Sequence, residues 1–325
     1  MSNFVCKNSE ILFLYDAKRC NPNGDMDNEN KPRMDWDAGR NLVSDVRLKR
    51  YIRDYLISIK KVPVFVRKLG EEALSAKEAI GLFKLHEIEG KPLSEISKKD
   101  LNINEKEMRA LGSQILDMID IRLFGATIPI DVETGKGASS NFTGPVQFNW
   151  GYSLNKIFEL QESKTITSHF KTGQSSAGAG VGKDYRVNYS FIAFSGGINA
   201  NTGSVTQLQE EDIDILDEAM IKSIPLSRTR SKVGQTPRLY LRFELIDNAR
   251  ALNDLREHLS LDYSIDNEEN LRDIQELKLN IDNLIDYIES NTKEIQKLVY
   301  WKDKNLNVRN FEKLLSVVTA EELSY

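Results

Sequence analysis

The sequence predicts an α+β fold in which a strand, a helix, two strands, a helix and a strand follow one another. Two patterns predict it. Apolar and polar side chains alternate over residues 146–150, 187–193 and 239–245, as in strands with one face in a core. Apolar side chains recur every three or four residues over 48–59 and 213–224, as along one side of a helix. This order is that of the ferredoxin-like (RRM-like) βαββαβ fold, which RNA-recognition modules also use.

The first strand and the first helix enclose a turn-rich loop. The apolar run at residues 11–15, Ile-Leu-Phe-Leu-Tyr, predicts a buried strand. Residues 21–25, Asn-Pro-Asn-Gly-Asp, are dense in turn formers and predict a loop. The helix begins near Asn41 or Ser44, because either side chain can cap it. Away from its apolar side the helix carries a basic ridge formed by Arg47, Lys49, Arg50 and Arg53.

Two insertions and a C-terminal extension complete the predicted organisation. Residues 70–118 are polar but favour helix, and they predict an inserted helical lobe. Residues 171–182 are too rich in Gly and Ser to pack a core, and they predict the mobile tip of an extended hairpin. The expected units are a ferredoxin-like domain over residues 1–60 and 119–250 with its hairpin at about 160–185, a helical lobe over 61–118, and a helical cap over 251–325.

The C-terminal cap is predicted from a heptad pattern. Isoleucines fall seven residues apart, and a second set of residues follows each of them by three positions. Such a pattern is typical of helices that pack along one seam. Because it spans only four repeats, an intramolecular helical cap is favoured over a parallel coiled coil. Asn291 is then either a break between two antiparallel helices or a polar seam position. The positions are Ile274, Ile281, Ile288 and Ile295, with Leu277, Leu284, Asn291 and Leu298.

The composition favours a globular protein that works in the cytoplasm. The 325 residues are 40% hydrophobic and 29% charged, which is enough for two packed domains or one domain with insertions. The chain has no apolar run of eighteen residues and no basic start followed by an apolar stretch, so we expect neither a membrane span nor secretion. Cys6 and Cys20 are too few for a disulfide framework, which favours a reducing compartment.

Positive charge is concentrated locally, although the net charge is −5. Residues 227–242 hold five bases and no acid, and residues 164–190 hold four bases against one acid. Residues 250–325 instead hold ten bases against sixteen acids. Because salt limits the reach of each charge to about 10 Å, local positive faces on an acidic protein can bind a phosphate chain. Ordinary solvated surface is the alternative interpretation.

Motifs for nucleotide or metal chemistry are incomplete. Gly182-Lys183 lacks both the earlier glycine and the following Ser or Thr of a phosphate-binding loop. The acids at 25, 27 and 29 begin like a calcium loop, but Asn30 stands where that loop needs glycine and Trp36 where it needs glutamate. The three histidines, His86, His169 and His258, are isolated. We therefore expect no metal, no cofactor and no catalytic residue.

The residues that remain suit a single-stranded nucleic acid. Guanidinium groups grip phosphate oxygens with paired hydrogen bonds, lysines add charge, and glycine lets a chain approach the backbone closely. Aromatic side chains could stack on bases, but strand alternation places several of them in the core, so none is assigned that role. The aromatic residues considered are Tyr15, Trp36, Phe142, Tyr185 and Phe191.

Five blocks of the sequence resemble the backbone subunit of type I CRISPR surveillance complexes (Cascade), most of all the I-B and I-C subtypes. The blocks occur in the family's order across residues 11–247, and five ordered blocks are far more specific than any one of them. They are Asn21–Asp25, Asn41–Arg53, Asp120–Thr127, Thr143–Phe148 and Thr229–Gln235.

The resemblance implies a molecule shaped like a right hand, with a ferredoxin-like palm, the helical lobe as fingers and the hairpin as thumb. Copies of such a protein polymerise along one CRISPR guide RNA, beside other Cascade subunits. The thumb of one copy folds over the guide held by its neighbour, and the guide stays free to pair with target DNA. The protein then holds backbone and shape while base pairing reads sequence, as in other RNA-guided systems. The expected role is a non-catalytic scaffold in antiviral defence.

The resemblance also places guide-binding residues by position. They belong to four parts of the chain: the loop before the first helix, that helix itself, the thumb, and the basic loop before the last strand. In that order they are Arg19, Arg33 and Arg40; Ser44, Lys49, Arg50 and Arg53; Lys171 and Lys183; and Arg228, Arg230, Lys232 and Gln235. Without the resemblance, arginines on a helix surface are more often salt-bridge partners.

Two enzymatic alternatives share the same palm. One is a CRISPR-RNA-processing endoribonuclease with His169 as general base. The other is the target-RNA-cleaving backbone subunit of type III complexes, which uses a loop aspartate, with Asp25 or Asp27 as the candidate. Both predict cleaved RNA, whereas a scaffold leaves RNA intact.

Overall fold

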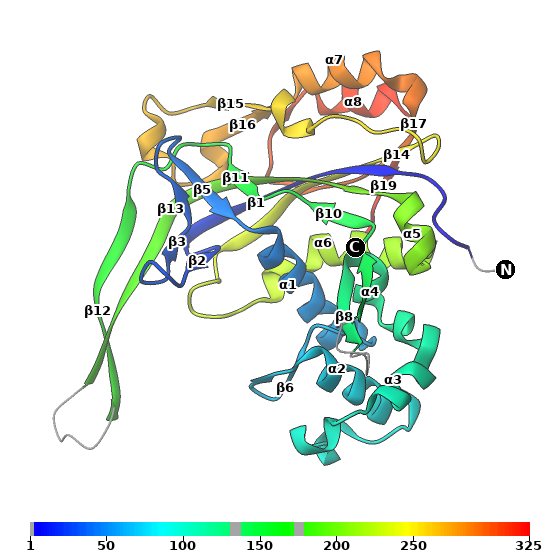
Figure 1. Ribbon diagram of the computed structural model, residues 1–325. Coiled ribbons are helices and arrows are strands. Elements are labelled where there is room, and N and C mark those ends of the chain that lie inside the picture. Colours follow the sequence, from blue (N-terminus) through cyan, green and yellow to red (C-terminus); the bar gives the residue numbers. More distant parts are fainter. Residues whose placement is uncertain (1–2, 131–137, 172–178) are drawn as a thin grey trace.

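A large, mostly antiparallel sheet forms the middle layer of the molecule (Figure 1). The computed structural model describes residues 3–130, 138–171 and 179–325. Helices α1 (Asp45–Tyr55) and α6 (Glu210–Leu226) cover one face of the sheet. The C-terminal helices α7 (Asp282–Ser290) and α8 (Phe311–Val317) lie over the other face. The prediction of an α+β fold is confirmed, and its three layers enclose two main cores.

The strands of this sheet follow the order β19-β17-β14-β1-β13-β11-β5-β4. Neighbours in this order are antiparallel, except β17 and β19, which are parallel. Strands β10 and β12 also pair with β13. The bounds are β1 (Ser9–Cys20), β4 (Met34–Asp35), β5 (Arg40–Val43), β10 (Val146–Phe148), β11 (Gly151–Ser153), β12 (Leu160–Lys171), β13 (Ala179–Ile198), β14 (Gln235–Leu245), β17 (Ile295–Lys302) and β19 (Ala320–Glu322).

The apolar run at residues 11–15 is confirmed as part of β1. Side chains of Ile11, Phe13 and Tyr15 pack in the core below the sheet, and Leu12 and Leu14 pack in the core above it. Because both faces of the strand are covered, the run is apolar throughout and does not alternate. The predicted strands at 187–193 and 239–245 are also confirmed, within β13 and β14. At 146–150 only the first half is right, because β10 ends at Phe148 and Trp150 is 44% exposed.

The two predicted helices are confirmed with one change. Helix α1 begins after Ser44, whose hydroxyl accepts a hydrogen bond from the backbone N–H of Arg47. Leu48, Ile52 and Tyr55 of α1 are buried as expected. Ile59 is exposed, because the chain changes to a π-helix over Leu56–Lys60 and so leaves the α-helical spacing. The apolar side of α6 is buried, and its members are Ile213, Leu216, Ala219, Met220 and Ile224.

Between α1 and α4 (Ile119–Phe124) the chain forms a lobe with its own core. Its elements are β6 (Lys68–Leu69), β7 (Glu72–Ala73), α2 (Ala76–Phe83) and α3 (Glu105–Leu111), followed beyond α4 by the hairpin of β8 (Gly125–Ile130) and β9 (Ala138–Thr143). Gly125 begins this hairpin with φ +75°, and a Cβ there would lie 2.1 Å from the carbonyl oxygen of Phe142. Only glycine fits a position that needs both this φ and this close approach.

The prediction of a helical segment at 251–325 is wrong over much of its length. Besides α7 and α8, the segment forms β15 (Ser260–Tyr263), β16 (Leu277–Asn280), β17, β18 (Val308–Arg309) and β19. The heptad isoleucines and leucines are all buried, but Leu284 and Ile288 lie in α7, whereas Leu277, Ile295 and Leu298 lie in strands. The predicted break at Asn291 is right in part: α7 ends there, but a short 3-10 turn and strand β17 follow in place of a second antiparallel helix.

The predicted extended hairpin consists of β12 and β13. Residues 160–171 pair with residues 179–187, and the two strands extend well beyond the body of the molecule (Figure 1). Its glycine-rich tip at residues 172–178 lies outside the described residues, so the predicted mobility is not addressed.

Candidate nucleic-acid interface

Three segments that are distant in sequence meet at the C-terminal end of β1. They are the loop at residues 21–24, the start of α1, and the loop at residues 227–235 that joins α6 to β14. The backbone N–H of Lys18 donates to the carbonyl of Gly234 at 2.8 Å, and the N–H of Asn21 donates to the carbonyl of Ser231 at 2.9 Å. These bonds fix the 21–24 loop beside the 227–235 loop.

An asparagine side chain joins the 21–24 loop to the cap of α1. The carboxamide oxygen of Asn23 accepts hydrogen bonds from the backbone N–H of Ser44 at 2.9 Å and from its hydroxyl at 3.0 Å. Ser44 in turn caps the helix. The sequence placed Ser44 among the guide-binding residues, but its polar groups are engaged within the protein, and it positions the start of α1.

Two cations, Arg47 and Lys232, lie at this junction without a carboxylate partner among the described residues. The guanidinium of Arg47 stacks 4.0 Å over the ring of Tyr51, donates to the hydroxyl of Ser227 at 3.4 Å, and keeps its Nε buried without an acceptor. The ammonium of Lys232 donates to the backbone carbonyls of Asn21 at 2.5 Å and Pro22 at 3.1 Å. Both cations are partly buried.

The pKa values at this junction show that burial disfavours the positive charge of Lys232. Burial, and after it the nearby Arg47, lowers the pKa of Lys232 to about 8. Burial also raises the pKa of the neighbouring Cys20 thiol to about 12, so this group stays neutral and supplies no negative charge. A phosphate oxygen beside Arg47 and Lys232 would favour both charges, because an opposite charge within a few ångströms stabilises the charged form.

Gln235 supports this junction from inside the protein. It is 5% exposed and exchanges hydrogen bonds with the hydroxyl of Tyr51, at 3.0 and 3.2 Å. Its side-chain amide also donates to the carbonyl of Lys232 at 3.0 Å. Gln235 therefore holds the shape of the 227–235 loop and does not face solvent.

A groove of about 370 Å³ opens beside Lys232. Its walls combine apolar side chains at the end of α6 with the backbone and polar groups of the 227–235 loop. Arg228 is exposed on its rim. The lining residues are Ile224, Pro225, Ser227, Arg228, Lys232, Val233, Gly234 and Gln235.

The base of the β12–β13 hairpin adds charge to the same end of the molecule. Arg186 pairs with Asp184 at 2.7 Å and donates to the carbonyl of Arg19 at 2.9 Å. Arg230 lies 3.4 Å from the same Asp184. Lys183 is exposed and lies 3.8 Å from both Glu29 and Glu162. Arg19 itself is exposed at the end of β1, with φ +50°.

The other predicted hairpin residues are placed only by their backbone. Lys171 is the last residue of β12, and His169 lies in the same strand.

The basic ridge of α1 is largely used within the protein. Lys49 is 9% exposed and contacts Asp45 at 3.1 Å and Gln147 at 2.8 Å. Arg50 pairs with Asp54 at 2.9 Å on the helix surface. Arg53 pairs at 2.8 Å with Asp120, which also accepts hydrogen bonds from the backbone of Phe65 and Val66 and so joins α1 to the lobe. Arg47 is the member of the ridge that has no acidic partner among the residues that the structure describes.

Arg33 and Arg40 lie farther along the same side of the sheet. Arg33 pairs with Asp25 at 3.2 Å and lies 5.9 Å from the ring of Trp150. Arg40 donates to the backbone carbonyls of Ser153 and Leu154, so it joins β5 to the segment after β11.

The sequence did not single out three residues that organise this site: Asn23, Arg47 and Arg186. Asn23 was within the predicted loop, and Arg47 was part of the basic ridge, but neither was assigned a role. Choosing Arg47 from the ridge requires knowing which bases have acids beside them, and most of those acids are distant in sequence or separated by one helical turn. The backbone contact of Arg186 with Arg19 has no signal in the sequence.

The described part of the chain holds no metal-binding cluster at this site. Within residues 3–130, 138–171 and 179–325, no group of three His, Cys, Asp or Glu side chains is placed to hold a metal ion. Of the candidate aspartates, Asp25 pairs with Arg33, and Asp27 is exposed in a turn.

Comparison with known proteins identifies one family that the chain matches. The family described as CRISPR-associated protein Cas7 matches residues 7–282. A protein of Haloferax volcanii described as "CRISPR-associated protein Cas7" is 30% identical over 295 residues, which cover 86% of this chain and 82% of that protein.

A solved structure has a similar fold at low sequence identity. One chain of a "CRISPR RNA-guided surveillance complex, pre-nicking" has 13% identity and a TM-score of 0.54, over 98% of this chain and 96% of that chain. A chain of a "CRISPR RNA-guided surveillance complex" has 13% identity and a TM-score of 0.49, over 98% and 95%.

Proposed function

Because the chain belongs to the Cas7 family of CRISPR-associated proteins, we propose that it is an RNA-binding backbone subunit of a CRISPR RNA-guided surveillance complex. In this role it holds the sugar-phosphate backbone of a guide RNA against the end of β1 and leaves the bases free. Copies bind side by side along the guide with other Cascade subunits, and the guide pairs with target DNA.

The observation that carries this proposal is the pair of cations at the loop junction. Buried or partly buried charges in proteins are normally paired, and an unpaired one is costly. Arg47 and Lys232 have backbone, hydroxyl and aromatic partners, but no described acid. A phosphate group of a bound polynucleotide would supply the missing negative charge and an acceptor for Arg47.

The exposed bases around this pair define a path for the RNA backbone. Arg19, Arg228 and Arg230 surround the junction, and Lys183 lies at the base of the hairpin. We assign Lys171, Arg33 and Arg40 to the same path as secondary contacts with the RNA backbone. Ser44 and Gln235 hold the loops, and Lys49, Arg50 and Arg53 act mainly through their acidic partners. This division differs from the sequence-based expectation, which gave all of them direct contact.

The palm of the proposed hand consists of the four strands β14-β1-β13-β11 with α1 and α6. In chain order these elements are β1, α1, β11, β13, α6 and β14. Their order in the sheet, with the first strand between the fourth and the third, supports a ferredoxin-like βαββαβ palm. The lobe would then be the fingers and the β12–β13 hairpin the thumb.

The proposal includes a cytoplasmic, non-catalytic role. No helix in the described parts of the chain combines the length and apolar character of a membrane span. Asp27 is exposed in a turn and His169 is placed only by its backbone, so a direct assay is needed to separate the two nuclease alternatives from the scaffold.

The proposal is tested by mixing the full chain with single-stranded CRISPR RNAs of increasing length, with and without magnesium. We expect intact RNA on denaturing gels and complexes whose mass rises stepwise with RNA length, measured by mass photometry. Metal-dependent cuts at regular spacing that disappear in Asp25→Asn or Asp27→Asn would establish the type III alternative. Cleavage abolished by His169→Ala would establish the processing enzyme. Absence of any RNA binding at low salt would contradict all three.

A further inference from the structure

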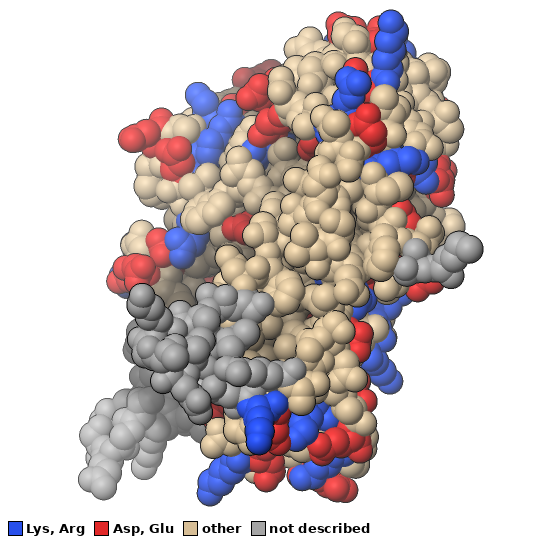
Figure 2. Space-filling view, turned by 45° about the vertical axis from the view of Figure 1, so that its right-hand side comes forward, with Lys and Arg blue, Asp and Glu red and all other residues tan. Residues whose placement is uncertain are grey.

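A second groove lies at the opposite end of β1 from the candidate RNA interface. Its volume is about 350 Å³, and its lining includes Asn8, Glu10, Thr143, Gln147, Asn199 and Thr202. Glu10 and Cys20 mark the two ends of the strand, so the grooves are roughly 30 Å apart. Figure 2 shows the face that is turned forward on this side. Its broad middle is poor in charged side chains, whereas charged side chains gather above and below it.

Glu10 is the one ionisable side chain in the lining of this groove. Its Oε1 accepts a hydrogen bond from the backbone N–H of Leu252 at 3.3 Å. Its other oxygen, Oε2, lies over Gly197, where an added Cβ would be 3.2 Å from it. No described Lys, Arg or His forms an ion pair with Glu10. Burial raises the pKa of Glu10 to about 7, against the effect of the Leu252 N–H, and Asp254 raises it further.

The amide side chains of the groove are already used. Asn8 accepts from the N–H of Ala200 at 2.9 Å and donates to the carbonyls of Asn248 and Arg250. Gln147 donates to the carbonyl of Gly144 at 2.9 Å and accepts from Lys49. The oxygen of Asn199 caps α5 (Ala200–Thr206).

The Glu10 carboxylate is therefore the group left to recognise an occupant. A carboxylate that is partly removed from water gains most from a cation that brings its own hydrogen bonds.

We propose that a lysine or arginine side chain of a second copy of this chain enters this groove and pairs with Glu10. The inference rests on the proposed function and deepens it by naming a contact between neighbouring copies. An exposed lysine with no ion pair among the described residues, Lys304, follows β17 near the other end of β1, where Leu239 pairs with both Leu14 and Lys302. Contact between unlike ends of identical molecules generates an open array unless the rotation between neighbours closes it into a ring. A linear array is what binding along one RNA requires.

The test compares Glu10→Lys and Glu10→Gln with the wild-type chain, and Glu257→Lys serves as the matched control. Glu257 is an exposed acid of the C-terminal segment that forms no described ion pair. Each protein is titrated onto an RNA that fits one copy and onto an RNA that fits several, and complexes are counted by mass photometry. Self-association without RNA is measured by sedimentation velocity at the same time.

We expect Glu10→Lys to bind the short RNA within about twofold of wild type but to add second and later copies about tenfold more weakly, because a close charge pair across an interface becomes a repulsion. Glu10→Gln should give a smaller loss, and Glu257→Lys none. Glu10→Gln should melt no lower than wild type, since it removes a desolvated charge. This variant carries the test if Glu10→Lys folds poorly.

Two results would overturn the inference. One is array formation by both Glu10 variants that equals wild type. The other is a wild-type chain that neither self-associates nor adds neighbouring copies. The proposed function fails separately, if wild type does not bind the short RNA.

Discussion

Arg47→Ala is expected to lower the affinity of the chain for single-stranded RNA by about 10- to 100-fold. Arg47 has no described acid beside it, and its Nε has no acceptor, so a bound phosphate would be its main ionic partner. A hydrogen bond to a charged group contributes about 1.5 to 3 kcal/mol, which corresponds to this range of affinity. The slope of log affinity against log salt should also fall by about 0.7, the value for one phosphate on a single strand. Fluorescence anisotropy with labelled RNA at several salt concentrations measures both quantities.

Arg50→Ala is the matched control for this experiment. Arg50 is on the same helix and has the same charge, but it pairs with Asp54 at its own surface. Its loss should change RNA affinity less than about threefold, because an exposed ion pair contributes little. Equal effects of the two substitutions would mean that the charge of the helix as a whole, and not the junction at Arg47, attracts the RNA.

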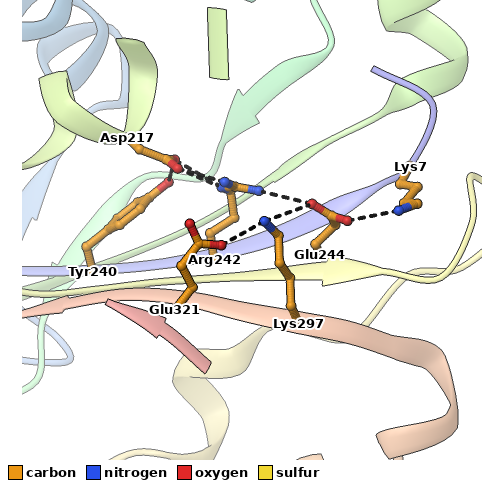
Figure 3. A network of polar contacts seen from close by, with 7 residues as sticks. All are labelled: Lys7, Asp217, Tyr240, Arg242, Glu244, Lys297 and Glu321. Atoms are coloured by element: carbon orange, nitrogen blue, oxygen red, sulfur yellow. Dashed lines mark hydrogen bonds and ion pairs between the residues drawn. The ribbon is translucent and has the colours of Figure 1, made fainter. Parts of the chain in front are cut away.

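Asp217→Asn is expected to lower the free energy of unfolding by about 3 to 5 kcal/mol. Figure 3 shows Asp217 of α6 pointing toward Arg242 and Tyr240 of β14. The carboxylate accepts from Arg242 at 2.7 and 3.0 Å and from the hydroxyl of Tyr240 at 2.6 Å. Burial alone would lower the pKa of Arg242. The Asp217 carboxylate raises this pKa by more, so the guanidinium stays charged. Without Asp217 the guanidinium of Arg242 stays buried, and Glu244, at 3.9 Å, is the one acid left beside it among the described residues.

The control is Asp214→Asn, one helical turn away on the same helix. Asp214 is exposed, forms no described ion pair, and has a pKa raised by burial and by Asp217, so neutralising it should leave stability within about 0.5 kcal/mol or increase it. Urea unfolding followed by circular dichroism compares the two variants. A shift in Asp217→Asn no larger than in Asp214→Asn would show that the pair between α6 and β14 does not stabilise the fold.

Much of the central fold was predictable because local patterns determine it. The spacing of Leu48 and Ile52, the alternation around Phe243, and the capping chemistry of Ser44 are all readable within one turn or one strand. The C-terminal segment was not predictable in this way. Its isoleucines, which are spaced seven residues apart, are buried beside the sheet. Whether a segment there forms a helix or a strand depends on β14, because β17 pairs with the open edge of that strand. That edge is distant in the sequence.

The site was predictable as a region but not as a set of contacts. The 21–25 motif, the start of α1 and the 227–235 loop were all selected from the sequence, and the structure brings the three together. The role of each base depends on its neighbours in space. Arg53 is held by Asp120, 67 residues away, whereas Arg47 has no such partner in the described parts of the chain. Ion pairs of this kind have no sequence signature.

Ultraviolet cross-linking of the wild-type chain to guide RNA, with the attached peptides identified by mass spectrometry, tests the central claim most directly. The account predicts that nucleotides attach to peptides that contain residues 19–24, 44–51 and 227–235, and that the C-terminal helices α7 and α8 remain unlabelled. Labelling confined to the C-terminal segment, with the end of β1 unmarked, would contradict it.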